Sequence, residues 1–173
     1  MEISNFYTVT IYEKGAEVVR MIHLMLGPEK FRAGSDLYFQ GHDGQAVTTE
    51  HFVKAMEDAS GVDLGQFRNW YSQAGTPVLE VEDSYDAEQQ RRTFTFTQST
   101  PPTPGQDEKL PLHIPVVFAL IGPDGADLPL RLVGEETAQG TTRTIELFEE
   151  TLSITFEDVP EGCVPSYLRG FSA

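Results

Sequence analysis

Two tyrosines near the start of the chain, Tyr7 and Tyr12, are the residues whose type and spacing best suit chemistry. A phenol has a reference pKa of about 10, so it remains a hydrogen-bond donor at neutral pH. Such a donor can stabilise the negative charge that develops on oxygen when water attacks a carbonyl group. Two aromatic rings at this spacing are also typical of a packed core. The spacing alone therefore leaves both interpretations open.

The histidines do not have the spacing of a metal site. His23, His42, His51 and His113 are scattered, and none belongs to an H-E-x-x-H helix, in which two imidazoles one turn apart bind zinc. We expect no metal to be bound by this chain. A glycine-rich phosphate loop and a G-x-S-x-G nucleophile elbow are also absent from the sequence. The single cysteine, Cys163, has no base beside it in the sequence and is predicted to be structural.

Carboxylates that are adjacent in the sequence, such as Glu57-Asp58 and Glu149-Glu150, do not form an evident acid–base pair. Neighbouring side chains point in different directions from a helix or a strand. These pairs therefore predict a solvated surface.

The elements that must position the tyrosines are predicted to be helical. Apolar residues recur at three- and four-residue steps before Gly75-Thr76-Pro77, which is the period of an amphipathic helix. Gly27-Pro28 is predicted to end one helix and begin the next. About four helices are expected, from Val18 to Leu26, from Pro28 to Phe39, from a cap at Thr48 or Thr49 to Gly61, and from Asp63 to Gly75.

After Pro77 the apolar period becomes two, which predicts strands. Arg92 to Thr97 alternates phenylalanine with threonine, whereas the proline-rich stretch from Ser99 to Gln106 is predicted to be a loop. Strands are expected at 78–82, 92–97, 112–121, 128–133, 143–148, 152–156 and 164–171. Seven short strands separated by turns favour an antiparallel, Ig-like β-sandwich. The predicted fold class is α+β, with a helical domain at residues 1–75 and a sandwich at residues 76–173.

The chain is strongly acidic, with a net charge of −15. Residues 1–75 contribute −4, and residues 76–173 contribute −11. An acidic surface repels nucleic-acid phosphates and anionic lipids, so neither is an expected partner. No apolar run is long enough to span a membrane. Because a single cysteine suits a reducing compartment, we expect the protein to be cytoplasmic.

The two tyrosines belong to a longer stretch that resembles a known family. Asn5-Phe6-Tyr7-Thr8 and Tyr12-Glu13-Lys14-Gly15 resemble the catalytic-tyrosine segment of the M1 zinc aminopeptidases, and of their bacterial branch in particular. Ala55 to Ser60 and Trp70 to Pro77 resemble the last helices of that family's thermolysin-like catalytic domain. Leu112 to Pro115 and Phe171 to Ala173 resemble the β-sandwich that follows it. The resemblance keeps its order and spacing over nearly the whole chain.

The resemblance implies roles for both tyrosines. Tyr12 would donate a hydrogen bond to the tetrahedral intermediate, and Tyr7 would lie near the pocket for the substrate's N-terminal side chain. The enzyme would use zinc to remove N-terminal residues from peptides. The family's zinc-binding helix, its third ligand and its G-x-M-x-N loop all lie upstream in the family. We therefore expect this chain to be a piece of a larger enzyme and to be inactive alone.

Two other interpretations remain open at this point. The chain could be a non-catalytic protein-binding module that uses its sandwich, or a scaffold whose helices cap the sandwich. Helices separated from the rest of their domain would expose an apolar face. That face would contact the remaining domains of the longer protein, or it could make the chain dimerise.

Overall fold

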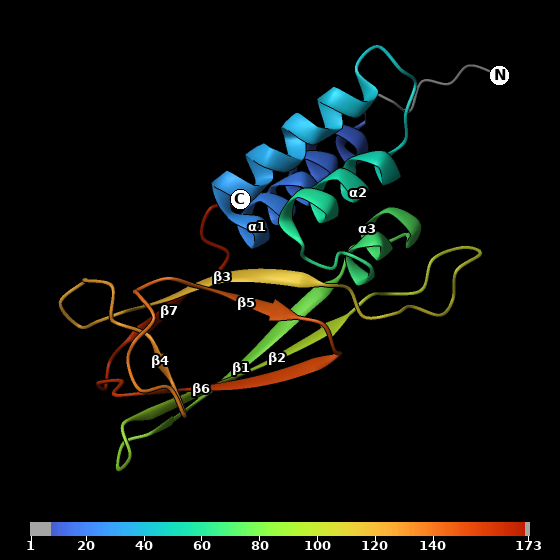
Figure 1. The fold of residues 1–173 in the computed structure, drawn as a ribbon. Helices are drawn as coiled ribbons and strands as arrows, with labels where there is room; N and C mark the ends of the chain where they lie inside the picture. Colours follow the sequence, from blue (N-terminus) through green and yellow to red (C-terminus); the bar gives the residue numbers. More distant parts are fainter. Residues whose placement is uncertain (1–7, 172–173) are drawn as a thin grey trace. The chain divides into compact units, whose positions relative to one another are not determined.

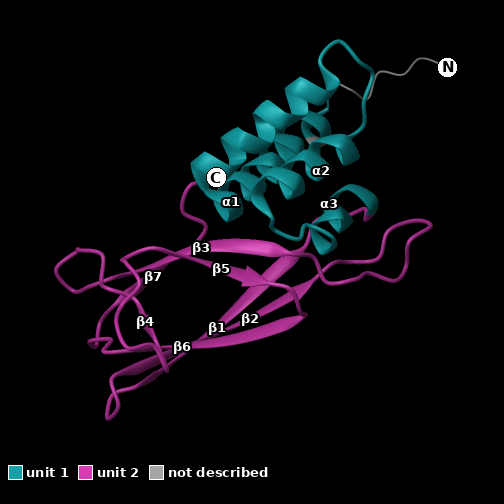
Figure 2. Cartoon of the chain, viewed as in Figure 1, with its two compact units in different colours: residues 1–72, 171–173 teal, residues 73–170 magenta. Residues whose placement is uncertain are grey.

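The computed structural model describes residues 8–171, apart from the side chain of Thr10. The chain divides into two compact units (Figure 2). Unit 1 contains the residues up to Ser72 together with Phe171, and unit 2 runs from Gln73 to Gly170.

Unit 1 is helical (Figure 1). Its elements are a π-helical turn η2 (Thr10–Lys14), α1 (Gly15–His42), α2 (Thr49–Ser60), a 3-10 turn η3 (Gln66–Arg68) and the short α3 (Asn69–Ser72). The described residues thus form three α-helices, and the prediction of about four is wrong.

The difference in helix number arises at Gly27. This residue has a φ of 74° and a ψ of 166°, so α1 has a kink there. The residue before a proline avoids helical dihedral angles, and glycine reaches a positive φ at little cost. Gly27-Pro28 therefore ends one helical arm, residues 15–26, and begins another, residues 28–42, as the sequence predicts. The label α1 covers both arms. The last predicted helix is only a 3-10 turn followed by a four-residue helix.

The two long helices of unit 1 approach each other closely at Gly34. A Cβ atom at this position would lie 2.5 Å from Met56 Sδ and 3.1 Å from Met56 Cα, so only glycine fits without movement. Thr48 is the N-cap residue of α2, which confirms the predicted cap. Its backbone N–H donates to His51 Nδ1 at 3.2 Å. The core of the unit consists of Val18, Met21, Ile22, Leu26, Val53, Met56, Leu64 and Phe67.

Unit 2 consists of seven strands in two antiparallel sheets. The strands are β1 (Val78–Asp86), β2 (Arg91–Ser99), β3 (Ile114–Ile121), β4 (Arg131–Leu132), β5 (Arg143–Leu147), β6 (Thr151–Glu157) and β7 (Val164–Ser166). The first sheet has the order β1-β2-β6-β4, and the second has the order β5-β3-β7. The predicted seven-stranded antiparallel sandwich is confirmed.

The alternation of residues in β2 determines which of its faces is buried. Phe94 and Phe96 are 0% exposed, and Phe94 packs edge-on against Phe118 at a centroid distance of 4.9 Å. Phe118 in turn stacks on Phe156 at 5.3 Å. The intervening threonines pair with hydroxyl groups of β6, so that Thr93 Oγ1 lies 2.8 Å from Thr155 Oγ1. The aromatic face is therefore the sandwich core.

Candidate functional site

Tyr12 lies in the π-helical turn η2, at the point where the chain enters α1. The backbone N–H groups of Ile11 and Tyr12 both donate to the carbonyl oxygen of Thr8 at 3.1 Å. The Tyr12 side chain is 58% exposed. Short π-helical segments occur often at functional sites. A ring with this exposure is not part of a packed core. Tyr7, the predicted substrate-binding residue, lies outside the described residues.

The residues that follow Tyr12 anchor the turn to α1. Lys14 is the N-cap residue of α1, and partial burial lowers the pKa of its ammonium group. Glu17 and Arg20 form an ion pair on the next turn, with Arg20 Nε 3.6 Å from a Glu17 carboxylate oxygen. Val18 on the same helix is 4% exposed. The turn is thus attached to a helix that is fixed by its core residues.

An apolar groove of about 530 Å³ is lined in part by Ile11, the residue before Tyr12, and we call it the helical groove. Its lining residues come from η2, both arms of α1, the start of α2, and α3. They are Ile11, Gly15, Val19, Phe31, Tyr38, Val47, Thr48, Thr49, Phe52 and Tyr71. None of these described lining residues is charged. Burial raises the pKa of the Tyr71 hydroxyl group.

Aromatic contacts fix one wall of the helical groove. Phe52 packs edge-on against Phe31 at 6.4 Å and against Tyr38 at 5.5 Å, measured between ring centroids. Edge-to-face pairs at such distances are the favoured geometry for aromatic rings. These contacts join α2 to the second arm of α1. This wall of the helical groove is therefore held in place by contacts within unit 1.

The described histidines have structural contacts and do not fit a zinc site. The ring of His23 packs against Phe31 at 5.0 Å, and the rings of His42 and His51 lie 4.8 Å apart. His113 Nε2 lies 2.8 Å from Glu146 Oε2, in the other unit. Across residues 8–171, no group of three or more His, Cys, Asp or Glu side chains is arranged to hold a metal ion.

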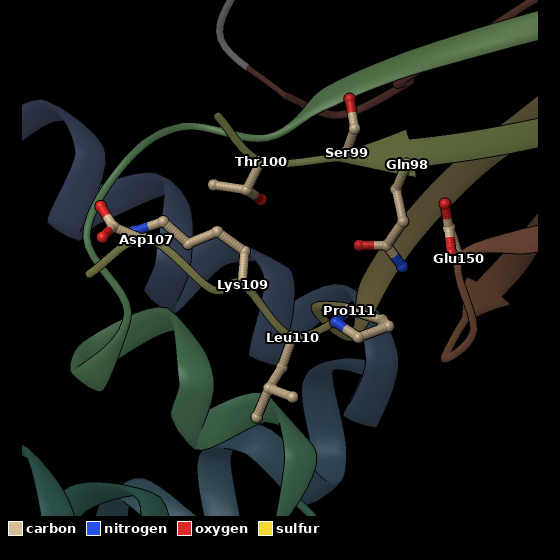
Figure 3. A pocket seen from close by; sticks show the side chains of 8 residues that line it. All are labelled: Gln98, Ser99, Thr100, Asp107, Lys109, Leu110, Pro111 and Glu150. Atoms are coloured by element: carbon tan, nitrogen blue, oxygen red, sulfur yellow. The ribbon is translucent and has the colours of Figure 1, made fainter. Parts of the chain in front are cut away.

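A second cavity, of about 270 Å³, lies in unit 2, and Figure 3 shows the side chains that line it. Gln98 is 3% exposed there. Its Nε2 group donates to the carbonyl oxygens of Leu112 at 2.8 Å and Glu149 at 2.9 Å. Its Oε1 atom accepts the Leu112 N–H at 2.8 Å. This buried amide fastens neighbouring segments together and is already hydrogen-bonded.

Lys109 also lines this cavity (Figure 3). It links its loop to the start of unit 2. Its Nζ donates to Ala74 O at 2.9 Å, Thr103 Oγ1 at 2.7 Å and Gln106 Oε1 at 2.9 Å. Gln73 exchanges two hydrogen bonds with the backbone of Leu110, at 3.1 and 2.8 Å. The three donors of Lys109 thus all have partners within the unit, which indicates a structural role for this cavity.

Comparison with known families agrees with the division of the chain. The family described as "Peptidase family M1 domain" matches residues 1–71. The family described as "Domain of unknown function (DUF3458) Ig-like fold" matches residues 75–173. The chain belongs to the DUF3458 Ig-like family through residues 75–173, and its residues 1–71 match the M1 peptidase domain. The predicted Ig-like character of the sandwich is therefore confirmed.

Similar proteins carry the same two parts within much longer chains. Aminopeptidase N of Escherichia coli (strain K12) is 47% identical over all 173 residues of this chain. Aminopeptidase N of Haemophilus influenzae (strain ATCC 51907 / DSM 11121 / KW20 / Rd) is 44% identical over the same span. The chain spans 19% of the length of each relative.

A solved structure has a similar fold. It is the crystal structure of Legionella pneumophila aminopeptidase A in complex with aspartic acid. The TM-score is 0.74 at 28% sequence identity, over 94% of this chain and 17% of the Legionella chain.

One ion-pair cluster was missed by the sequence interpretation. Glu57, expected to lie on a solvated surface, binds Arg68 Nη1 at 2.7 Å, and its side chain is only 20% exposed. Arg68 Nη2 also binds Glu50 at 2.7 Å. Glu50 and Glu57 are seven residues apart on one helix and therefore share a face, which is the signal that could have indicated the pair. The cluster ties α2 to η3.

No helix among the described residues has the length and apolar character that a bilayer crossing requires.

Proposed function

We propose that this chain is part of a zinc-dependent M1 aminopeptidase that removes N-terminal residues from peptides. In this proposal residues 1–75 form the end of the catalytic domain, and residues 76–173 form a structural Ig-like sandwich. The observation that carries the proposal is the placement of Tyr12. Its ring is 58% exposed in a π-helical turn, within a chain that is 47% identical to an aminopeptidase N over its whole length.

The proposed role of Tyr12 follows from the chemistry of its hydroxyl group. Attack on a peptide carbonyl group places negative charge on the carbonyl oxygen. A neutral phenol can donate a hydrogen bond to that oxygen. This hydrogen bond becomes stronger as the negative charge develops in the transition state. The anchored turn would limit the movement of the hydroxyl group. Tyr7 would then contact the side chain of the substrate's first residue.

The catalytic zinc ion belongs, in this proposal, to the rest of the longer protein. When bound, it supplies the Lewis acidity for the attack of water on the substrate. The described histidines are engaged in contacts within their own units, so the ligands would come from elsewhere. The partners of this chain are then the peptide substrate and the remaining domains. A single, buried cysteine, Cys163, supports a cytoplasmic location.

The decisive experiment is the substitution Tyr12→Phe in the full-length protein. The ring remains, and only the hydroxyl group is lost. We expect kcat for an alanyl-nitroanilide substrate to fall about 10²–10³-fold, with little change in KM. Tyr85→Phe is a matched control, because the Tyr85 hydroxyl group donates to Val159 O at 3.0 Å within the sandwich. A Tyr12→Phe enzyme with the kcat of the wild type would refute the role.

A separate measurement tests the 173-residue chain alone. We expect it to retain no zinc after dialysis and to hydrolyse no alanyl-nitroanilide. Zinc-dependent turnover by the pure chain would show that it carries a complete active site. That result would contradict the proposal that the zinc ligands lie in the rest of the longer protein.

A further inference from the structure

The helical groove has the character of an internal surface. Ile11, which lines it, is 52% exposed, and Tyr71 on another wall is 37% exposed. Val9 and Tyr12, which lie within two residues of Ile11 in the sequence, are 75% and 58% exposed. Soluble proteins rarely leave such contiguous apolar surface in contact with water unless a partner covers it.

The lining of the helical groove indicates the chemistry of its occupant. No lining residue among those described is charged. The Thr48 hydroxyl group lies 3.1 Å from His51 Nδ1, so it already has a hydrogen-bond partner. Aromatic and aliphatic side chains form most of the remaining surface. A groove of this kind suits apolar side chains better than an ionic ligand.

The comparisons indicate where those apolar side chains come from. Residues 1–71 match an M1 peptidase domain, and the Ig-like match begins at residue 75. In the longer protein, the remainder of the M1 domain is therefore expected to precede these residues in the sequence. The chain covers only 19% of its aminopeptidase N relatives, so there is ample polypeptide to supply an occupant. One of the groove residues, Ile11, lies near the beginning of the region that matches the M1 peptidase domain.

We propose that the helical groove is the packing site of an apolar segment that lies N-terminal to this chain in the same polypeptide. This inference rests on the proposed function, because it needs the remainder of a catalytic domain. It assigns the contact to a defined surface: Ile11, Val19, Phe52 and Tyr71 pack against that segment. The Tyr12 turn is then held from both sides, by α1 and by the upstream segment.

The test uses the reactivity of engineered cysteines towards a bulky maleimide. The native Cys163 is 5% exposed, so it reacts slowly in this chain. Ile11→Cys places a thiol in the helical groove. Leu37→Cys is the control, because Leu37 is 39% exposed in the same unit and does not line the groove. Each substitution is made in the isolated chain and in the full-length protein, and labelling at each position is followed by peptide mass spectrometry.

We expect the thiol at position 11 to react quickly in the isolated chain and about a hundredfold more slowly in the full-length protein, where exchange needs local opening. The thiol at position 37 should react quickly in both. Equal rates at position 11 in the two proteins would overturn the proposal. The isolated chain is labelled at low concentration, so that a second copy does not cover the groove. Activity and zinc content of the full-length wild type are measured separately. An inactive full-length protein without zinc would contradict the proposed function, whereas fast labelling at position 11 in an active protein would contradict only the proposal for the groove.

Discussion

Removal of the Arg68 guanidinium group should destabilise unit 1 in a pH-dependent way. Arg68 Nη1 lies 2.7 Å from Glu57 Oε1, and the two side chains are 26% and 20% exposed. Fully exposed ion pairs contribute about 0–1 kcal/mol, whereas breaking a buried pair costs about 3–5 kcal/mol. The partial burial places the cost of Arg68→Met at about 1–2 kcal/mol near neutral pH.

The pH dependence follows from the carboxylate. The hydrogen bond from Arg68 holds the pKa of Glu57 below its usual range, against the opposing effect of desolvation. A carboxyl group with a lowered folded-state pKa contributes stability above its unfolded pKa of about 4.3. That contribution is lost as the pH falls through the folded-state value. The difference between wild type and Arg68→Met should therefore be largest near neutral pH and should shrink in acid.

The assay is urea unfolding of the isolated chain, followed by fluorescence. Trp70 is the only tryptophan, and its ring centroid lies 6.5 Å from that of Phe67 in unit 1, so it reports that unit. Arg32→Met is the control, because Arg32 and Asp36 form a pair whose side chains are 78% and 50% exposed. We expect no measurable shift for this control. Equal urea midpoints for the two variants would refute the reasoning. A loss of stability in Arg68→Met that is as large in acid as at neutral pH would also refute it.

Three further substitutions test the packing and capping of each unit. Gly34→Ala should destabilise unit 1 by about 1–3 kcal/mol in the Trp70 assay, because the new Cβ would lie 3.1 Å from the backbone of Met56. Thr48→Ala should cost about 1 kcal/mol in the same assay through the loss of the α2 cap, and Thr48→Asn should restore most of it. Gln98→Leu should lower the stability of unit 2 by about 2–4 kcal/mol, because it leaves buried backbone partners unpaired, and thermal unfolding followed by far-UV circular dichroism measures it. An unchanged midpoint in any of the three would contradict the corresponding contact.

Local pattern was sufficient to predict most of the sandwich. The Phe/Thr alternation of β2 corresponds to one buried and one solvated face, since Phe94 is 0% exposed and Thr95 Oγ1 pairs with Ser153 Oγ. Strand period is a property of neighbouring residues, so it can be recognised without knowing the partner strand. The cap at Thr48 was predictable for the same reason.

The features that sequence could not supply depend on contacts between distant residues. Gly27-Pro28 correctly indicates the interruption of α1, but nothing local shows how the second arm is placed against α2, where Gly34 meets Met56. The Arg68 cluster needs η3 to return to the face of α2 that carries Glu50 and Glu57. The helical groove likewise combines residues as far apart as Ile11 and Tyr71. The family resemblance indicated Tyr12, but not that this residue lies 58% exposed in a π-helical turn.

The attachment of the proline-rich loop to Gln73 and Ala74 has a practical consequence for anyone who wishes to produce the sandwich alone. A recombinant boundary at Gly75, which sequence comparison suggests, would delete the carbonyl group that accepts from Lys109 and the amide that pairs with Leu110. The Lys109 ammonium group would lose one hydrogen-bond acceptor, and Leu110 would lose its hydrogen bonds to the Gln73 side chain. Expression of this domain should therefore begin at or before Gln73.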